Sequence, residues 1–161
     1  MSKQNKENLF LLIKSLSKSE KRQFKLFVGR VKSNKDSKFI KLFNLLDKST
    51  IYSEIEILKK NFVTKQQLSN LKAHLYNQIL QSLRMNPMLQ DNRMLIREQI
   101  DYATVLYQKG LYKQSLKILE KPKNMSIDLD EKYSAFEIVE IEKLIESQYI
   151  TRSMSNRADE L

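Results

Sequence analysis

The sequence predicts an all-α fold of about eight helices: an N-terminal helical bundle, then an antiparallel helix hairpin and a final long helix. The first supporting observation is composition, because the 161 residues include only two glycines and two prolines. Sheet proteins need turn residues more often than this. The second is that apolar side chains recur at spacings of three and four residues, which is typical of helices with one buried face.

Three capping boxes predict where helices begin. In this motif a Ser or Thr oxygen accepts from the backbone N–H three residues later, and the Glu or Gln there reaches back to the first residue. The three pairs are Ser17–Glu20, Ser53–Glu56 and Thr64–Gln67. Asp91 is the expected N-cap of a further helix.

Proline and glycine predict where helices end. Pro87 stops one helix, because the residue before a proline disfavours the helical conformation. Gly110 allows a tight turn, and Pro122 ends or kinks the helix after that turn. Residues 121–130 are then a loop, and residues 151–161 a frayed tail. The predicted helices cover residues 6–16, 18–33, 37–48, 53–62, 65–85, 91–109, 112–121 and 130–151.

The sequence offers little for catalysis. It has no cysteine and one histidine, His74, on the polar face of the 65–85 helix, so a His/Cys zinc site is excluded. The pair Asp128 and Asp130 lacks the glycine and distal glutamate of a calcium loop. No apolar run approaches the roughly 18 residues of a membrane span. We therefore expect a cytoplasmic, non-enzymatic protein without metal or cofactor.

Charge divides the chain into two parts. Residues 1–87 hold 18 Lys and Arg against 6 Asp and Glu, a net charge of +12, whereas residues 88–161 are close to neutral at −2. We therefore expect a basic N-terminal helical subdomain over 1–87 and a second helical region over 88–161. A basic excess of this size predicts either an anionic partner or a well-hydrated surface.

Basic residues share one face of the 18–33 helix, where Gly29 lies among them at helical spacing. Cations aligned in this way can neutralise successive phosphates, and Gly29 would let a ligand approach the backbone. The candidate anion or nucleic-acid contacts are Lys18, Arg22, Lys25, Lys32, Lys35, Lys38 and Lys41. A solvated face, an acidic protein partner and an anionic membrane surface are the alternatives.

A second hypothesis for nucleic acid concerns a helix-turn-helix over residues 53–85. The longer helix begins with Gln66, Gln67 and Asn70, whose side chains can hydrogen-bond to base edges. Against this, the turn lacks glycine and the long helix is apolar over about half of its surface. Lys72 falls within that apolar arc, so its ammonium must reach the surface or find a partner.

The stretch DYATVLYQKGLYKQSLKILEK, within residues 95–121, resembles a tetratricopeptide repeat, a helix–turn–helix unit of about 34 residues. The residues that match the family's pattern are Ala103, Gly110, Tyr112, Ser115 and Leu119. The resemblance implies that small residues at 103 and 115 let two antiparallel helices pack closely. The pattern departs from the family at Gln99, where tryptophan is usual, and at Pro122, where alanine is usual.

The final predicted helix is apolar on two sides. Phe136 and Val139 share one side with Tyr133 nearby, and four residues share roughly the opposite side. A helix of this kind is sandwiched, so one side should meet the hairpin and the other a further repeat, a second copy or a target. The candidate protein interface is Ile138, Ile141, Ile145 and Tyr149. The alternative is that the N-terminal helices fold over this side.

Tetratricopeptide repeats need about three copies to bury a continuous core, and one hairpin plus one helix is visible here. We therefore expect the chain to be the start of a longer solenoid or to self-associate. The segments LLIKSLSKSEKRQFKLF, KFIKLFNLLDK and LKAHLYNQILQSLR also resemble the start of a group of uncharacterised bacterial helical proteins. In that group such a segment precedes tetratricopeptide-like helices, and the group implies no activity.

The function predicted from sequence is a helical interaction or scaffold module. It would bind a protein segment, or assemble with itself through the tetratricopeptide-like helices. Nucleic-acid binding by the basic N-terminal helices is the alternative.

Overall fold

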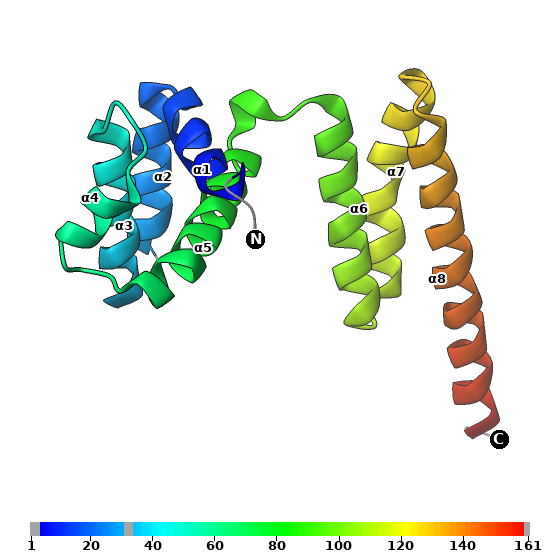
Figure 1. The fold of residues 1–161 in the computed structure, drawn as a ribbon. Coiled ribbons are helices and arrows are strands. Elements are labelled where there is room, and N and C mark those ends of the chain that lie inside the picture. Colours follow the sequence, from blue (N-terminus) through cyan, green and yellow to red (C-terminus); the bar gives the residue numbers. More distant parts are fainter. Residues whose placement is uncertain (1–3, 31–33, 160–161) are drawn as a thin grey trace. The chain divides into compact units, whose positions relative to one another are not determined.

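The structure, a computed structural model, describes residues 4–30 and 34–159 of the chain (Figure 1). Within those ranges it contains eight α-helices, one short 3-10 turn and no strand, which confirms the all-α prediction. The chain forms two compact units, Met1–Leu89 and Gln90–Leu161. The change of charge along the sequence placed the division after residue 87, close to this boundary.

Among the described residues, the first unit contains five helices and the second contains three. The elements of the first unit are α1 (Gln4–Ser15), α2 (Lys18–Arg30), α3 (Asn34–Lys48), α4 (Glu54–Lys59), α5 (Lys65–Arg84) and the 3-10 turn η1 (Pro87–Leu89). The elements of the second unit are α6 (Asn92–Gln108), α7 (Tyr112–Asp128) and α8 (Lys132–Asp159).

Capping side chains begin these helices where the sequence predicted. At α2 the Ser17 N–H donates to Glu20 Oε2 at 2.7 Å, and the Glu20 N–H donates to Ser17 Oγ at 3.2 Å, so both halves of the capping box form. Ser53 and Thr64 cap α4 and α5 through their side-chain oxygens. Asp91 accepts from the Met94 N–H at 2.8 Å and so begins α6.

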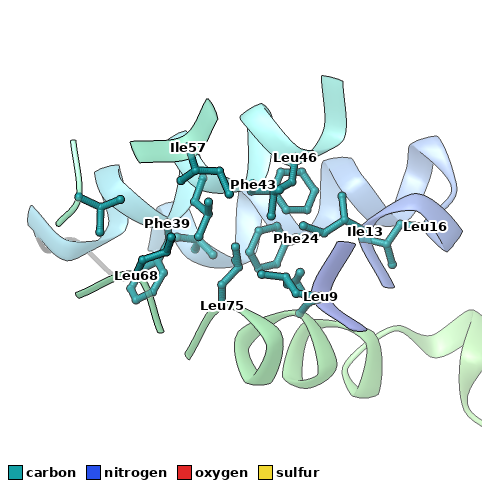
Figure 2. Packing of buried hydrophobic residues seen from close by; sticks show 14 residues of the cluster. Leu9, Ile13, Leu16, Phe24, Phe39, Phe43, Leu46, Ile57, Leu68 and Leu75 are labelled. Carbon is teal, nitrogen blue, oxygen red and sulfur yellow. The ribbon is translucent and has the colours of Figure 1, made fainter. Parts of the chain in front are cut away.

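The first unit is a bundle in which α5 packs against α1, α2 and α3. Buried apolar side chains from all five helices form a single core, and the rings of Phe24 and Phe43 lie 4.7 Å apart between their centroids (Figure 2). Leu75 of α5 is completely buried in this core. The arrangement buries one side of α2 and leaves its other side in solvent.

Lys72 of α5 finds the partners that its position in the apolar arc required. Its ammonium donates to the Tyr52 hydroxyl at 3.0 Å and to Glu54 Oε2 at 3.4 Å. It also lies 5.6 Å from the centroid of the Tyr52 ring. The charge is therefore paired with a carboxylate at the edge of the core.

In the second unit α6 and α7 form an antiparallel hairpin (Figure 1). The two small residues of the predicted contact, Ala103 and Ser115, are both completely buried. The Ser115 hydroxyl donates to the Ala103 carbonyl at 2.7 Å, which requires the two helix backbones to lie close together. Leu119 is buried in the same core, and the ring of Tyr112 packs on that of Tyr107 at 5.6 Å.

Both turns of the second unit have the same C-terminal capping motif. After α6 the Leu111 N–H donates to the Leu106 carbonyl, and Gly110, with φ 74°, takes the left-handed position. After α7 the Glu131 N–H donates to the Ser126 carbonyl at 2.8 Å, and Asp130, with φ 53°, takes that position. The second turn thus reproduces the first without a glycine.

Two predictions about the second unit are wrong. Pro122 does not end α7, which continues to Asp128, and the segment expected to be a loop is mostly helix. Pro122 is buried, so its ring contributes to the core while it removes one backbone donor, and Ser126 donates its hydroxyl to the Pro122 carbonyl at 2.7 Å. The segment expected to fray continues α8 to Asp159.

Candidate interaction surfaces

The sequence of α2 determines which of its faces reaches solvent. Phe24 and Val28 are buried in the core of the first unit, one turn apart on the same side of the helix. Lys18, Arg22 and Lys25 follow the opposite side and are exposed. Because the apolar residues are buried on one side of α2, the basic residues on the other side lie in solvent. This exposure agrees with the helical spacing of the basic residues in the sequence.

These cations border a surface concavity. It has a volume of about 450 Å³ and is lined by Lys18, Lys21, Arg22, Lys25 and Leu26. Leu26 is an apolar side chain with an exposed fraction of 59%. Three of the seven candidate contacts predicted from the sequence therefore line one concavity. Lys21 lines it too, although the helical spacing did not place this residue among the candidates.

The four cations differ in what they contact. Lys21 forms an ion pair with Asp47 of α3 at 2.8 Å, so its charge is already balanced. The Lys25 ammonium lies 5.6 Å from the centroid of the Phe43 ring. In the part of the chain with described side chains, no carboxylate forms an ion pair with Lys18, Arg22 or Lys25. Three positive charges of this face are therefore not balanced by described acidic residues.

The other predicted contacts do not line this concavity. Lys38 and Lys41 are exposed on α3, outside its lining. Lys32 lies outside the described residues, and so does the side chain of Lys35. We call the set Lys18, Arg22, Lys25 and Gly29 the basic face of α2.

Gly29 lies on the basic face with open space around it. A Cβ atom built on this residue meets no atom within 4 Å, so packing within the described chain does not require a glycine here. In an exposed helix a glycine costs about 1 kcal/mol relative to alanine. The folded unit therefore supplies no packing reason for this residue.

The region expected to form a helix-turn-helix is helical on both sides of a short turn. Gln66, Gln67 and Asn70 are exposed at the start of α5, as base contacts would need to be. The partner helix α4 has only six residues, and its Ile57 is buried in the core. The remainder of α5 packs in the bundle through Leu68, Leu75 and Ile79.

His74 is exposed on α5, and its ring stacks on Phe39 at 4.9 Å between centroids with an interplanar angle of 24°. Nowhere among the described residues do three His, Asp or Glu side chains gather as metal ligands.

None of the helices described here has the length and apolarity needed to cross a membrane.

On α8 the expected protein interface has to be corrected. Ile138 and Ile145 are completely buried in the core of the second unit, together with Ile96 and Ile100 of α6 and Leu119 of α7. Ile141 packs partly buried against the same core, and Tyr149 keeps an exposed fraction of 41%. Because this side of α8 covers the hairpin of its own unit, Ile138 and Ile145 are not available to a partner.

Ion pairs also connect α8 and the turn before it to the hairpin. Arg97 of α6 binds both carboxylate oxygens of Glu137, at 2.6 and 2.7 Å, and Lys123 of α7 binds Glu142 at 2.6 Å. Arg93 pairs with Glu131, the residue before α8, and this hydrogen bond raises the pKa of Arg93 above its ordinary value. The pairs join α8 to both helices of the hairpin, so they oppose rotation of α8 about its axis.

The other side of α8 presents aromatic side chains to solvent. Tyr133 has an exposed fraction of 93% and Phe136 of 67%, and the two residues lie three apart, on neighbouring positions of the helix surface. Ile127 and Leu129, at the end of α7, are also exposed. We call Tyr133 and Phe136 the aromatic pair of α8. The sequence showed this apolar side, but its pattern did not tell which of the two sides would be covered.

Comparison with known proteins adds no relative: no protein-family model, no curated protein and no solved structure matches this chain.

Proposed function

We propose that this chain is a non-enzymatic interaction protein whose second unit self-associates through the aromatic pair of α8. The observation that supports this proposal is the exposure of Tyr133 and Phe136 on a helix whose opposite side is buried in its own core. Large apolar side chains exposed together are typical of interaction surfaces. Aromatic residues also supply most of the binding free energy at many protein interfaces.

A second copy is the partner that this surface favours. A two-fold interface uses the same patch on both molecules, so one aromatic pair is sufficient to form it. In helical repeat arrays an outermost helix is either capped by polar residues or covered by the next element. The outer side of α8 has aromatic residues at its start, and a second α8 packed there would cover them. The tetratricopeptide-like unit would then join two copies of the chain in an assembly.

Sedimentation velocity of the full chain over a range of concentrations tests the proposal. The weight-average mass should rise above the 19.1 kDa of one chain as the concentration increases. The double variant Tyr133→Ser, Phe136→Ser should weaken association by at least about tenfold, which corresponds to about 1.4 kcal/mol. Both side chains are exposed, so the circular dichroism spectrum should not change.

The matched control is the double variant Glu120→Ser, Lys121→Ser, which changes two exposed residues of α7, away from the aromatic pair, and keeps the net charge of the chain. It should associate like the unmodified chain. A mass of one chain at every concentration would contradict the proposal, and so would equal association of the aromatic and control variants.

A further inference from the structure

We infer that the basic face of α2 binds the sugar–phosphate backbone of a nucleic acid, without reading the bases. This site lies in the first unit and does not depend on self-association of the second. Its components are a concavity of about 450 Å³, cations that line it, and a glycine without a packing role.

Charge complementarity points to a polyanion. Lys21 is already paired with Asp47, so its charge is not available to a ligand. Lys18, Arg22 and Lys25 have no acidic partner among the described side chains, and the sequence around them, residues 1–87, has a net charge of +12. Such an excess attracts anions over a distance of about one Debye length, roughly 8–10 Å at physiological salt.

The spacing of the cations suits a nucleic-acid strand. Measured along α2 from Lys18, at about 1.5 Å per residue, Arg22 lies about 6 Å away and Lys25 about 10 Å away. Phosphates follow one strand of a duplex at about 3.4 Å along its axis, so these separations correspond to two and three phosphate steps. Gly29 continues the same line of the helix without a side chain, which leaves the α2 backbone open to close approach.

A lipid surface fits less well. A helix that lies on a membrane inserts its apolar face into the lipid, but Phe24 and Val28 of α2 are buried in the protein core. Only Leu26 of the concavity lining is apolar and exposed. The face therefore offers charge and one small apolar contact, which match phosphates and a sugar ring.

Fluorescence anisotropy with a labelled DNA duplex of about 20 base pairs tests the inference, at 50 and 200 mM salt. Three phosphate contacts predict a slope of log K against log salt near −2.7, and hence a roughly 40-fold loss of affinity between the two salt concentrations. The triple variant Lys18→Gln, Arg22→Gln, Lys25→Gln should remove most of the binding at 50 mM salt and most of this slope. Duplexes of different sequence should bind equally.

The matched control is Lys59→Gln, Lys60→Gln, Lys65→Gln, which removes the same charge from exposed residues of the same unit. It should retain binding within about threefold, because only long-range attraction is reduced. Loss of binding in this control equal to that of the α2 variant would overturn the inference. Thermal unfolding followed by circular dichroism shows whether each variant folds.

Two further probes separate the sources of negative charge. Polyglutamate represents an acidic protein, and vesicles of phosphatidylcholine with phosphatidylserine represent an anionic membrane. Both should bind more weakly than the duplex at equal salt. The inference fails if no duplex binds at 50 mM salt, or if either probe binds as tightly as the duplex through the same three side chains.

Discussion

Two residues with a left-handed backbone make the turns of the second unit, and they differ in the strain that a side chain adds. Gly110 has φ 74° and Asp130 has φ 53°. Glycine adopts this conformation without a Cβ clash, and aspartate is among the few residues that tolerate it. The sequence predicted the first turn because glycine marks it. It did not predict the second, because aspartate occurs in many conformations.

The two glycines of the chain should respond oppositely to alanine. Gly110→Ala places a Cβ on a left-handed residue and should lower the free energy of unfolding by about 1 kcal/mol. Gly29→Ala, in a helix with no atom within 4 Å of the new Cβ, should raise it by about 0.5–1 kcal/mol. Urea unfolding followed by the helical circular dichroism signal measures both. Equal destabilisation by the two variants would contradict the assigned roles.

At the scale of helices, the sequence predicted beginnings better than ends. A capping oxygen acts on a backbone N–H only three residues away, so Ser17, Thr64 and Asp91 could be recognised locally. The continuation of α7 through Pro122 depends on burial of the proline ring against other helices, which is a property of the folded unit. A local rule for proline therefore ended the predicted helix too early.

The contact between Ser115 and Ala103 of the hairpin should not tolerate a larger side chain. Ser115→Leu would force a branched side chain between α6 and α7, where the hydroxyl now lies 2.7 Å from the Ala103 carbonyl. We expect the free energy of unfolding to fall by about 1–3 kcal/mol, because overpacking shifts the helices apart. Lys117→Leu makes the same side chain at an exposed position of α7 and should change it by less than about 0.5 kcal/mol. Thermal unfolding of both variants compares them, and similar losses would argue against a close approach at residue 115.

At the scale of the whole molecule, the change of charge along the sequence lies close to the boundary between the two compact units. The sequence did not predict which side of α8 would cover the hairpin. Both sides of α8 have apolar residues at helical spacing, and the buried side is the one that packs against Ile96 and Ile100 of α6, which are distant in sequence. The basic face of α2 was predictable, because the periodicity of Phe24 and Val28 determines which side is buried.

The most direct test of the account is hydroxyl-radical footprinting of the full chain at low and high protein concentration, since it measures side-chain exposure residue by residue. In the dilute chain Tyr133 and Phe136 should be oxidised rapidly, while the buried Phe24 and Phe43 should be protected. At high concentration Tyr133 and Phe136 should become protected several-fold, because a second copy covers them, and exposed Tyr102 of α6 should not change. Equal oxidation of the aromatic pair at both concentrations, or protection of the pair already in the dilute chain, would contradict the account.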